Sequence, residues 1–244
     1  MDDEPPIVDP AVDSVTKQFL RDGVDTQFLS EPFLEASEVG DADSLRHDLA
    51  GLSGDELRRR VKAVDQHGSS GLMLAARRGD ADVVDVLLGA GANPNDADST
   101  GVTALHHASS RGSVAIIDSL LQACAEVNKS DDNGDLPLMW AVGARAIHRL
   151  LEARADAHAT NKAGKTALMQ ASGTGNAGGI EALARVPGTD LDLCDKQGLT
   201  AHAIATAADD AEAGGLLVGL GAAATVIPSR ILLQEEALHE AARQ

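Results

Sequence analysis

The sequence predicts an all-α protein that folds as a solenoid of about five repeats, with divergent helical caps at its ends. The first observation is a turn signal followed by two apolar helical segments, which recurs about every 33 residues. The second is the composition, in which Ala, Leu and Gly dominate and Phe, Trp and Tyr together make up 2%. A single globular core usually contains more aromatic side chains, whereas short helices at close approach need small residues. The apolar share of 43% is enough to bury a core.

The turn signal has the form Asp/Asn-x-x-Gly, and its glycines are spaced 33, 33, 30 and 34 residues apart. Its five copies are Asp65–Gly68, Asp98–Gly101, Asp131–Gly134, Asn161–Gly164 and Asp195–Gly198. An aspartate with a glycine three residues on suits a tight turn, because its side chain caps backbone N–H groups and the glycine accepts positive φ.

A first helix is expected directly after each turn, where Ser or Thr accepts from free N–H groups at the helix start. These residues are Ser70, Thr103, Thr166 and Thr200. Gly79, Gly112 and Gly175 are expected to end the first helix, and a second helix returns antiparallel to a left-handed cap at Gly91 or Gly221. No single unit can bury its apolar stripe, so neighbouring units must stack.

These units resemble the ankyrin repeat, a turn and two helices in about 33 residues. Gly101–Ala108 (GVTALHHA) is similar to the signature G-x-T-P-L-H-x-A, and Val83–Asn95 resembles the second helix with its exit turn. The resemblance covers residues 64–224, divided into 64–97, 98–130, 131–160, 161–194 and 195–224. It implies that His106 bridges the backbone of its own loop.

Several residues depart from the family pattern. The signature proline occurs only as Pro137, and Cys124 and Arg154 replace the glycine that ends the second helix. If these two residues must be left-handed, each costs about 1 kcal/mol. The third repeat lacks three residues around 143–146, which predicts a shortened first helix or inter-helix turn. Asn128 either satisfies backbone groups between repeats or, by resemblance, is a substrate of asparaginyl hydroxylases.

The ends differ from the repeats. Residues 31–63 are expected to form a divergent N-terminal cap, with an extra helical turn at 53–63, and residues 225–244 a C-terminal capping helix. Residues 1–30 form an acidic arm, partly disordered, with Phe19-Leu20 and Phe28-Leu29 between acidic residues. Either the arm folds back over the first repeat, or it is a linear motif that docks on a partner.

The formal charge of −18 and the pI of about 4.6 disfavour nucleic acids and anionic membranes, both of which select basic surfaces. No apolar run reaches the ~18 residues of a membrane span. The acidic start, Met1–Glu4, does not resemble a secretory signal, and Cys124 and Cys194 are isolated. We therefore expect reduced thiols in a cytoplasmic or nuclear protein that is a monomer or a subunit of a hetero-complex.

Motifs with possible chemistry have structural explanations. Gly173–Gly178 fits G-x-G-x-x-G, but a dinucleotide site needs a preceding strand, and here a helical run precedes it. Gly164-Lys165-Thr166 resembles the end of a phosphate-binding loop and also lies in a repeat turn. The eight histidines lack metal-ligand spacing. We expect no catalytic residue, cofactor or metal, and hence no enzyme.

The resemblance implies that a partner protein binds along the concave face, on turn tips and first helices. The turn-tip candidates are Gln66, His67, Thr100, Val102, Asp132, Asn133, Asp135, Lys162 and Lys165. The first-helix candidates are Arg77, Arg78, His107, Arg111 and Trp140, where Trp140 either borders the groove or packs between repeats three and four. The predicted function is that of a protein-binding adaptor or scaffold. The alternative is a structural subunit that Phe19 and Phe28 of the arm anchor in a larger assembly.

Overall fold

The computed structural model describes residue 34 and residues 42–223. This part of the chain contains 12 helices and no strand. Two N-terminal helices, α3 (Ala42–Ala50) and α4 (Gly54–Val61), precede five helix pairs. The pairs are α5 (Gly71–Arg78) with α6 (Ala81–Gly89), α7 (Ala104–Ser110) with α8 (Val114–Gln122), α9 (Pro137–Trp140) with α10 (Ala144–Glu152), α11 (Ala167–Gly173) with α12 (Ala177–Ala184), and α13 (Ala201–Ala207) with α14 (Ala211–Gly219). The prediction of an all-α solenoid is confirmed.

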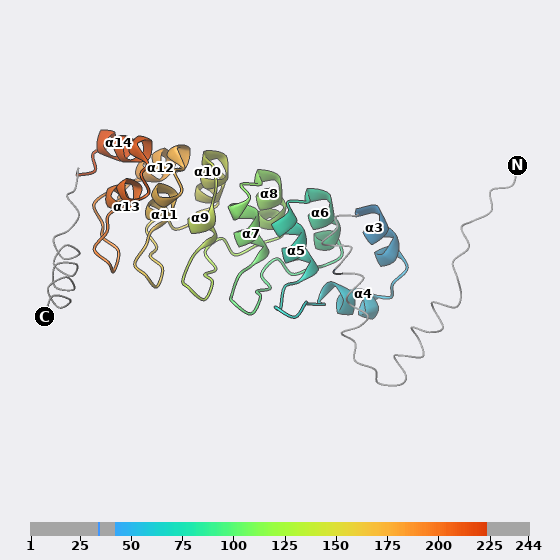
Figure 1. The fold of residues 1–244 in the computed structure, drawn as a ribbon. Helices are drawn as coiled ribbons and strands as arrows, with labels where there is room; N and C mark the ends of the chain where they lie inside the picture. Colours follow the sequence, from blue (N-terminus) through green and yellow to red (C-terminus); the bar gives the residue numbers. More distant parts are fainter. Residues whose placement is uncertain (1–33, 35–41, 224–244) are drawn as a thin grey trace, which may run out of the picture.

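The helices form two rows, as Figure 1 shows. The first helices of the pairs form the inner row, from α5 to α13, and the second helices form the outer row, from α6 to α14. Long turns project from the stack in one direction below the inner row. A continuous apolar core runs between the rows.

Small side chains allow the inner helices to approach each other closely. Ala75, Ala76 and Ala108 are completely buried on inner helices, while Ile116 and Ile117 are completely buried on α8. Each large aliphatic side chain removed from water contributes roughly 1.5–3 kcal/mol. Contacts between neighbouring inner helices, such as α5 with α7, are as extensive as contacts within a pair, such as α5 with α6, so the core depends on both.

Side-chain caps fix where the helices begin. Ser70, Thr166 and Thr200 accept hydrogen bonds from the N–H groups of the third helical residues, at 3.2–3.4 Å. Asp80, Asn176 and Asp210 cap the outer helices in the same way. The four sequence-predicted start residues all occupy N-cap positions.

A shared hydrogen-bond pattern holds the projecting turns. Asp65 Oδ1 accepts from the backbone N–H groups of His67 and Ser69, both at 2.8 Å. Equivalent pairs of bonds are accepted by Asp98, Asp131, Asn161 and Asp195. The five turn glycines all have φ between 78° and 81°. The predicted turn chemistry is therefore confirmed.

Each turn is also bonded to the next one. Asp132 N–H donates to Thr100 O at 2.9 Å, and Ser99, Lys162 and Lys196 repeat this bond at the other three steps. A Cβ atom added to Gly101 would lie 2.9 Å from Asp132 N. Glycine is needed there both for its positive φ and for the close approach of the following turn.

A second set of bonds connects the exit turns that follow the outer helices. The Asn95 side chain donates to Cys124 O at 3.1 Å and accepts from Glu126 N at 2.7 Å. Asn128 makes the same pair of bonds to Arg154 O and Asp156 N, at 3.1 and 2.8 Å. Asn128 thus satisfies backbone groups between repeats, as one of its two interpretations expected.

The third pair has the predicted shortening. Its inner helix, α9, has 4 residues, whereas α7 and α11 have 7 each. Ala141 is extended and Gly143 has φ 84°, so the chain enters α10 without a regular turn. The three missing residues are taken from the end of the inner helix and from its turn.

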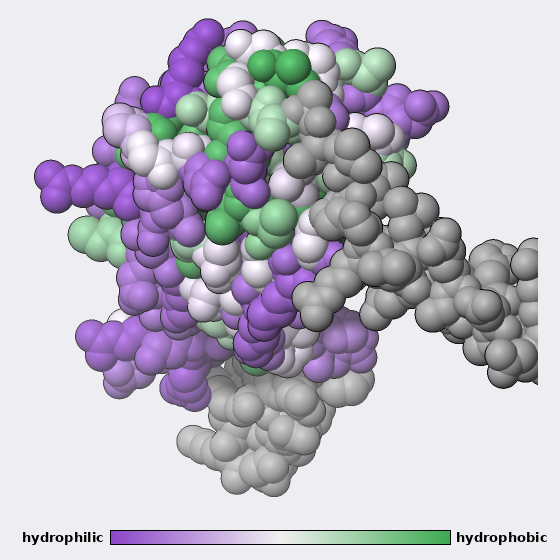
Figure 2. Space-filling view, turned by 90° about the vertical axis from the view of Figure 1, so that its left-hand side faces the viewer, coloured by the Kyte–Doolittle hydropathy of each residue, from purple (hydrophilic) through white to green (hydrophobic). Residues whose placement is uncertain are grey.

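Only part of the predicted caps lies within the described residues. Leu34 is helical and buried, α3 packs on α6, and α4 is the extra helical segment expected at 53–63. The rest of the 31–63 cap, the 1–30 arm and the 225–244 helix lie outside the described residues. Figure 2 shows the C-terminal end of the stack, where apolar residues are surrounded by hydrophilic ones.

Cys124 and Arg154 have φ values of 65° and 66°, as expected for residues that replace a left-handed glycine. We predict that Arg154→Gly, and likewise Cys124→Gly, stabilises the fold by about 0.5–1 kcal/mol, the left-handed penalty less the extra chain entropy of glycine. The shift of the urea unfolding midpoint measures this effect. The control is Ala153→Gly, because Ala153 has φ −79° and should lose stability. Equal losses of stability in Arg154→Gly and Ala153→Gly would exclude backbone strain at Arg154.

Candidate functional site: the inner groove

The turn tips present most of the predicted contact residues to solvent. Among these candidates, the exposed ones are Gln66, His67, Thr100, Asp132, Asn133 and Lys162, and Lys165 is half-buried. The turn tips are rigid because the Asp/Asn hubs and the bonds between turns hold their backbones. At Asp98, burial opposes ionisation, but hydrogen bonds from Thr100 and Val102 outweigh it and lower the pKa of the carboxyl group.

Two turn-tip candidates are not available to a partner. Val102 is 6% exposed and Asp135 is 9% exposed. Both follow a turn hub by four residues, and their N–H groups donate back to it. Asp135 Oδ1 also accepts from the Asn161 side chain at 2.7 Å, so it supports the next turn. The burial of both side chains leaves little of either residue exposed for a partner.

His106 connects two repeats. Its Nδ1 accepts from Thr103 N–H at 3.2 Å, and its Nε2 lies 3.0 Å from Asp135 O. Since Nδ1 accepts, Nε2 carries the proton and donates to the carbonyl. The side chain is completely buried. His106 therefore bridges its own loop, as expected, and also bridges to the following turn.

The three arginine candidates gather where α5 and α7 end. Arg77 and Arg78 form the last positions of α5, and Arg111 is the C-cap of α7; all three are exposed. The Arg111 side chain lies over Gly79, where an added Cβ would be 2.6 Å from its Nε. Positive side chains are favourable at helix C-termini. Neighbouring repeats therefore place three cations next to one another.

His107 connects these cations to Trp140. Burial, followed by the nearby charge of Arg77, lowers the pKa of His107 to about 4. Its ring lies edge-on to Trp140, with 6.3 Å between the centroids. The Trp140 ring makes a second edge contact with His106, at 5.4 Å. The aromatic contacts of Trp140 are thus with repeat two, and its side chain also packs against the apolar core.

Val142 belongs to the same surface, although the repeat pattern did not predict it there. It is 52% exposed, directly after the short helix α9. Val142 N–H donates to Ser109 O at 3.0 Å, and Val142 O would be 2.5 Å from a Cβ added to Gly112. Val142 therefore lies beside the end of α7, next to Arg111. The three-residue deletion was the available signal, because shortening α9 brings this residue to the surface.

We name Arg77, Arg78, Arg111, Trp140 and Val142 the arginine–tryptophan patch. Phe19 and Phe28, the candidates on the arm, lie outside the described residues. The Gly173–Gly178 segment ends α11, turns and begins α12, as the repeat register predicted. Cys124 and Cys194 are free and exposed.

The described residues contain no group of three or more His, Cys, Asp or Glu side chains able to hold a metal ion. Within the same residues, no helix has the length and apolar character needed to cross a membrane.

Repeated helix pairs joined by bonded turns define a helical solenoid. A family model described as ankyrin repeats (3 copies) matches residues 72–151, so this part of the chain consists of ankyrin repeats. Comparison with curated proteins gives no match. Ankyrin repeats generally mediate protein–protein interaction, and proteins of this family are typically non-enzymatic.

We predict that the two neighbouring histidines make stability depend on pH. In the unfolded chain they bind protons near pH 6.5, but in the folded protein burial lowers the pKa of both, to about 4 for His107. The unfolded state therefore binds more protons, and stability falls as pH drops from about 6.5 to about 4. Urea midpoints across this range measure the fall.

His107→Gln should make this fall shallower than in the wild type. His148→Gln is the matched control, because His148 is exposed on α10. Apart from Asp98, whose pKa the nearby His107 helps to lower, the carboxyl groups keep the same surroundings in all three proteins. If the urea midpoint falls with pH at the same slope in wild type and in His107→Gln, the lowered pKa of His107 is contradicted.

Proposed function

We propose that this chain is an adaptor or scaffold that binds a partner protein through the inner groove, at the arginine–tryptophan patch and the neighbouring turn tips. The observation that supports this proposal is the meeting of three exposed arginines, a half-exposed tryptophan and an exposed valine over α5, α7 and α9. Tryptophan and arginine are enriched among residues that dominate binding energy.

The chemistry of the patch favours a partner segment that combines acidic and apolar side chains. The arginines complement carboxylates, and Trp140 with Val142 offers apolar area beside them. The chain as a whole carries a formal charge of −18, so the attraction is local and not a property of the net charge. Acidic turn-tip residues such as Asp132 in repeat three separate this positive surface from the lysines on the turn tip of repeat four.

The protein acts in the cytoplasm or nucleus under this proposal, as a monomer or as a subunit of a hetero-complex, and does not bind nucleic acid. Support comes from the acidic composition and from two isolated, free cysteines.

We predict that the charge reversal Arg77→Glu/Arg78→Glu/Arg111→Glu weakens partner binding by at least about tenfold, because hot-spot residues each contribute more than about 1 kcal/mol. Affinity capture from native lysate with quantitative mass spectrometry compares this variant with wild type. The matched control is Arg145→Glu/Arg185→Glu, which reverses two exposed charges in the outer row. Circular dichroism checks that the helices remain.

A partner that both variants retain would exclude the groove. A second candidate function, a subunit attached through its arm, is supported by seven acidic residues against two basic ones in residues 1–30. Deleting residues 1–30 separates the two: loss of every partner with intact helices would favour attachment through the arm over the groove.

A further inference from the structure

The exit turns of the third and fourth pairs lack the side-chain clip that joins the earlier ones. His158 occupies the position of Asn95 and Asn128 in the repeat register. Among the described residues, its ring makes no hydrogen bond to the following exit turn, 188–192. A carboxamide has its donor and acceptor side by side, as a bond to a carbonyl and a neighbouring N–H requires, whereas imidazole nitrogens diverge. The contact between the third and fourth exit turns, which we call the seam, therefore lacks this side-chain clip.

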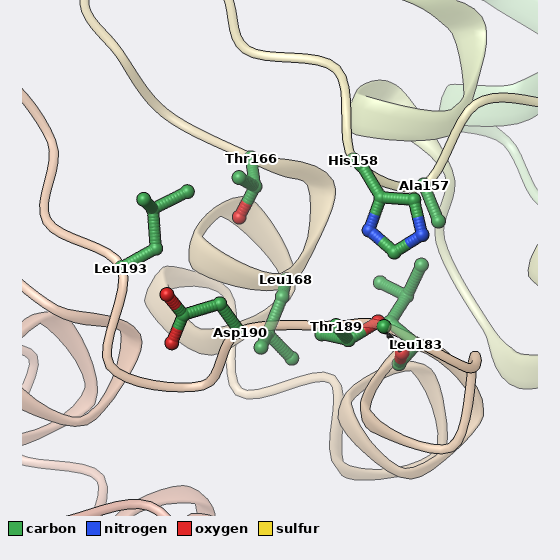
Figure 3. Close-up of a pocket in the computed structure, with 9 residues that line it drawn as sticks. Ala157, His158, Thr166, Leu168, Leu183, Thr189, Asp190 and Leu193 are labelled. Atoms are coloured by element: carbon green, nitrogen blue, oxygen red, sulfur yellow. Dashed lines mark hydrogen bonds between the residues drawn. The ribbon is translucent and has the colours of Figure 1, made fainter.

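A cavity of about 160 Å³ lies at this open seam (Figure 3). Figure 3 shows His158 on one side and Asp190 with Leu193 on the other, with Thr166 and Leu168 between them. Leu168 and Leu183 are buried in the core, and Leu193 is 37% exposed. The corresponding residues in the three earlier exit turns are Asp96, Lys129 and Ala159. The cavity thus has apolar walls, and a large apolar side chain, Leu193, lies at its mouth.

Two of the polar groups at the cavity, Asp190 and Thr189, present hydrogen-bond acceptors. Asp190 Oδ1 accepts from Asp192 N at 3.0 Å, and its second oxygen has no partner among the described residues. Thr189 Oγ1 already donates its proton to Leu183 O at 3.0 Å, so only its lone pairs remain. Asp156, Asp190 and Asp192 are all exposed in the two exit turns. A ligand that matches these groups has an apolar stem and a positively charged end with N–H donors.

We propose that this cavity is a subsite for one arginine or lysine side chain of a partner protein. The methylene groups of that side chain lie on Leu168, Leu183 and Leu193, and its charged end meets Asp190. A cavity of about 150 Å³ holds a group the size of benzene, whereas sites for drug-sized ligands start at roughly 300 Å³. The volume therefore fits one side chain and not a cofactor.

This subsite lies on the exit turns and is distinct from the arginine–tryptophan patch, so it goes beyond the proposed groove function. The two surfaces have opposite charge preferences, and one chain is able to hold an acidic segment in the groove and a basic one at the seam. Charge reversal of Arg77, Arg78 and Arg111 is expected to leave the subsite intact, which keeps the two proposals separable.

The test titrates the full ¹⁵N-labelled chain with the peptide acetyl-Gly-Arg-Gly-amide and follows backbone amide shifts. We expect saturable shifts at His158, Gly188, Thr189 and Asp190. The same peptide with norleucine in place of arginine should bind about three- to fivefold more weakly, the size of a partly exposed ion pair. Equal binding of both peptides, shifts spread elsewhere, or no saturation would overturn the proposal.

Two variants test whether the charge of Asp190 and the volume of the cavity are needed for binding. Asp190→Asn should weaken the arginine peptide about three- to fivefold and leave the norleucine peptide unchanged. The matched control is Glu126→Gln. Glu126 is exposed and occupies the register position of Asp190 two repeats earlier, where the Asn95 side chain joins the exit turns. Unchanged arginine binding in Asp190→Asn, or an equal loss in Glu126→Gln, contradicts the subsite.

His158→Asn should restore the clip, with bonds to Gly188 O and Asp190 N like those of Asn128. We expect a higher urea midpoint and loss of the peptide shifts, because the closed seam removes the cavity. A stabilised His158→Asn protein that still binds the arginine peptide as tightly as wild type would exclude the cavity as its site. If His158→Asn does not fold, the proposal is tested by comparing how tightly Asp190→Asn and Glu126→Gln bind the arginine peptide.

Discussion

The distance between successive turns is the constraint on which the rest of the structure depends. No helix pair buries its own apolar stripe, so stability requires each pair to meet the next at one fixed spacing. The bond from Asp132 N–H to Thr100 O and the close approach at Gly101 set that spacing where two turns meet. At this spacing the alanines of the inner row and the isoleucines of the outer row are completely buried.

Repetition explains how much the sequence predicted. A residue at a known offset inherits the backbone of its equivalents, so the left-handed φ values of Cys124 and Arg154 followed from Gly91 alone. The short α9 followed from a count of missing residues. Offsets give backbone position but not the direction of a side chain in a turn. For this reason Val102 and Asp135 were assigned to the surface, although their N–H groups must face the turn hub and their side chains pack inward.

Residues that depart from the repeat pattern carry most of the candidate functional surface. Consensus positions satisfy hydrogen bonds or fill the core, as His106 does between Thr103 and Asp135. Trp140 and Val142 instead follow from a helix that ends early, and their neighbours across repeats, not their own unit, determine what they touch. Such contacts form between residues about 30 positions apart. A single repeat in isolation gives no sign of them.

The third repeat departs from the pattern on two different surfaces. Both departures are tolerated because each repeat of a solenoid contacts only its two neighbours. Its short inner helix alters the groove, while His158 opens the seam on the exit turns. In a globular core, a lost turn or an open seam would disturb packing throughout, because tightly packed interiors transmit strain. In a stack, each interface depends only on its two neighbours, so the cost stays local. The turn hubs on either side, Asp131 and Asn161, keep their bonds. One repeat can therefore be specialised for binding while the spacing of the others is preserved.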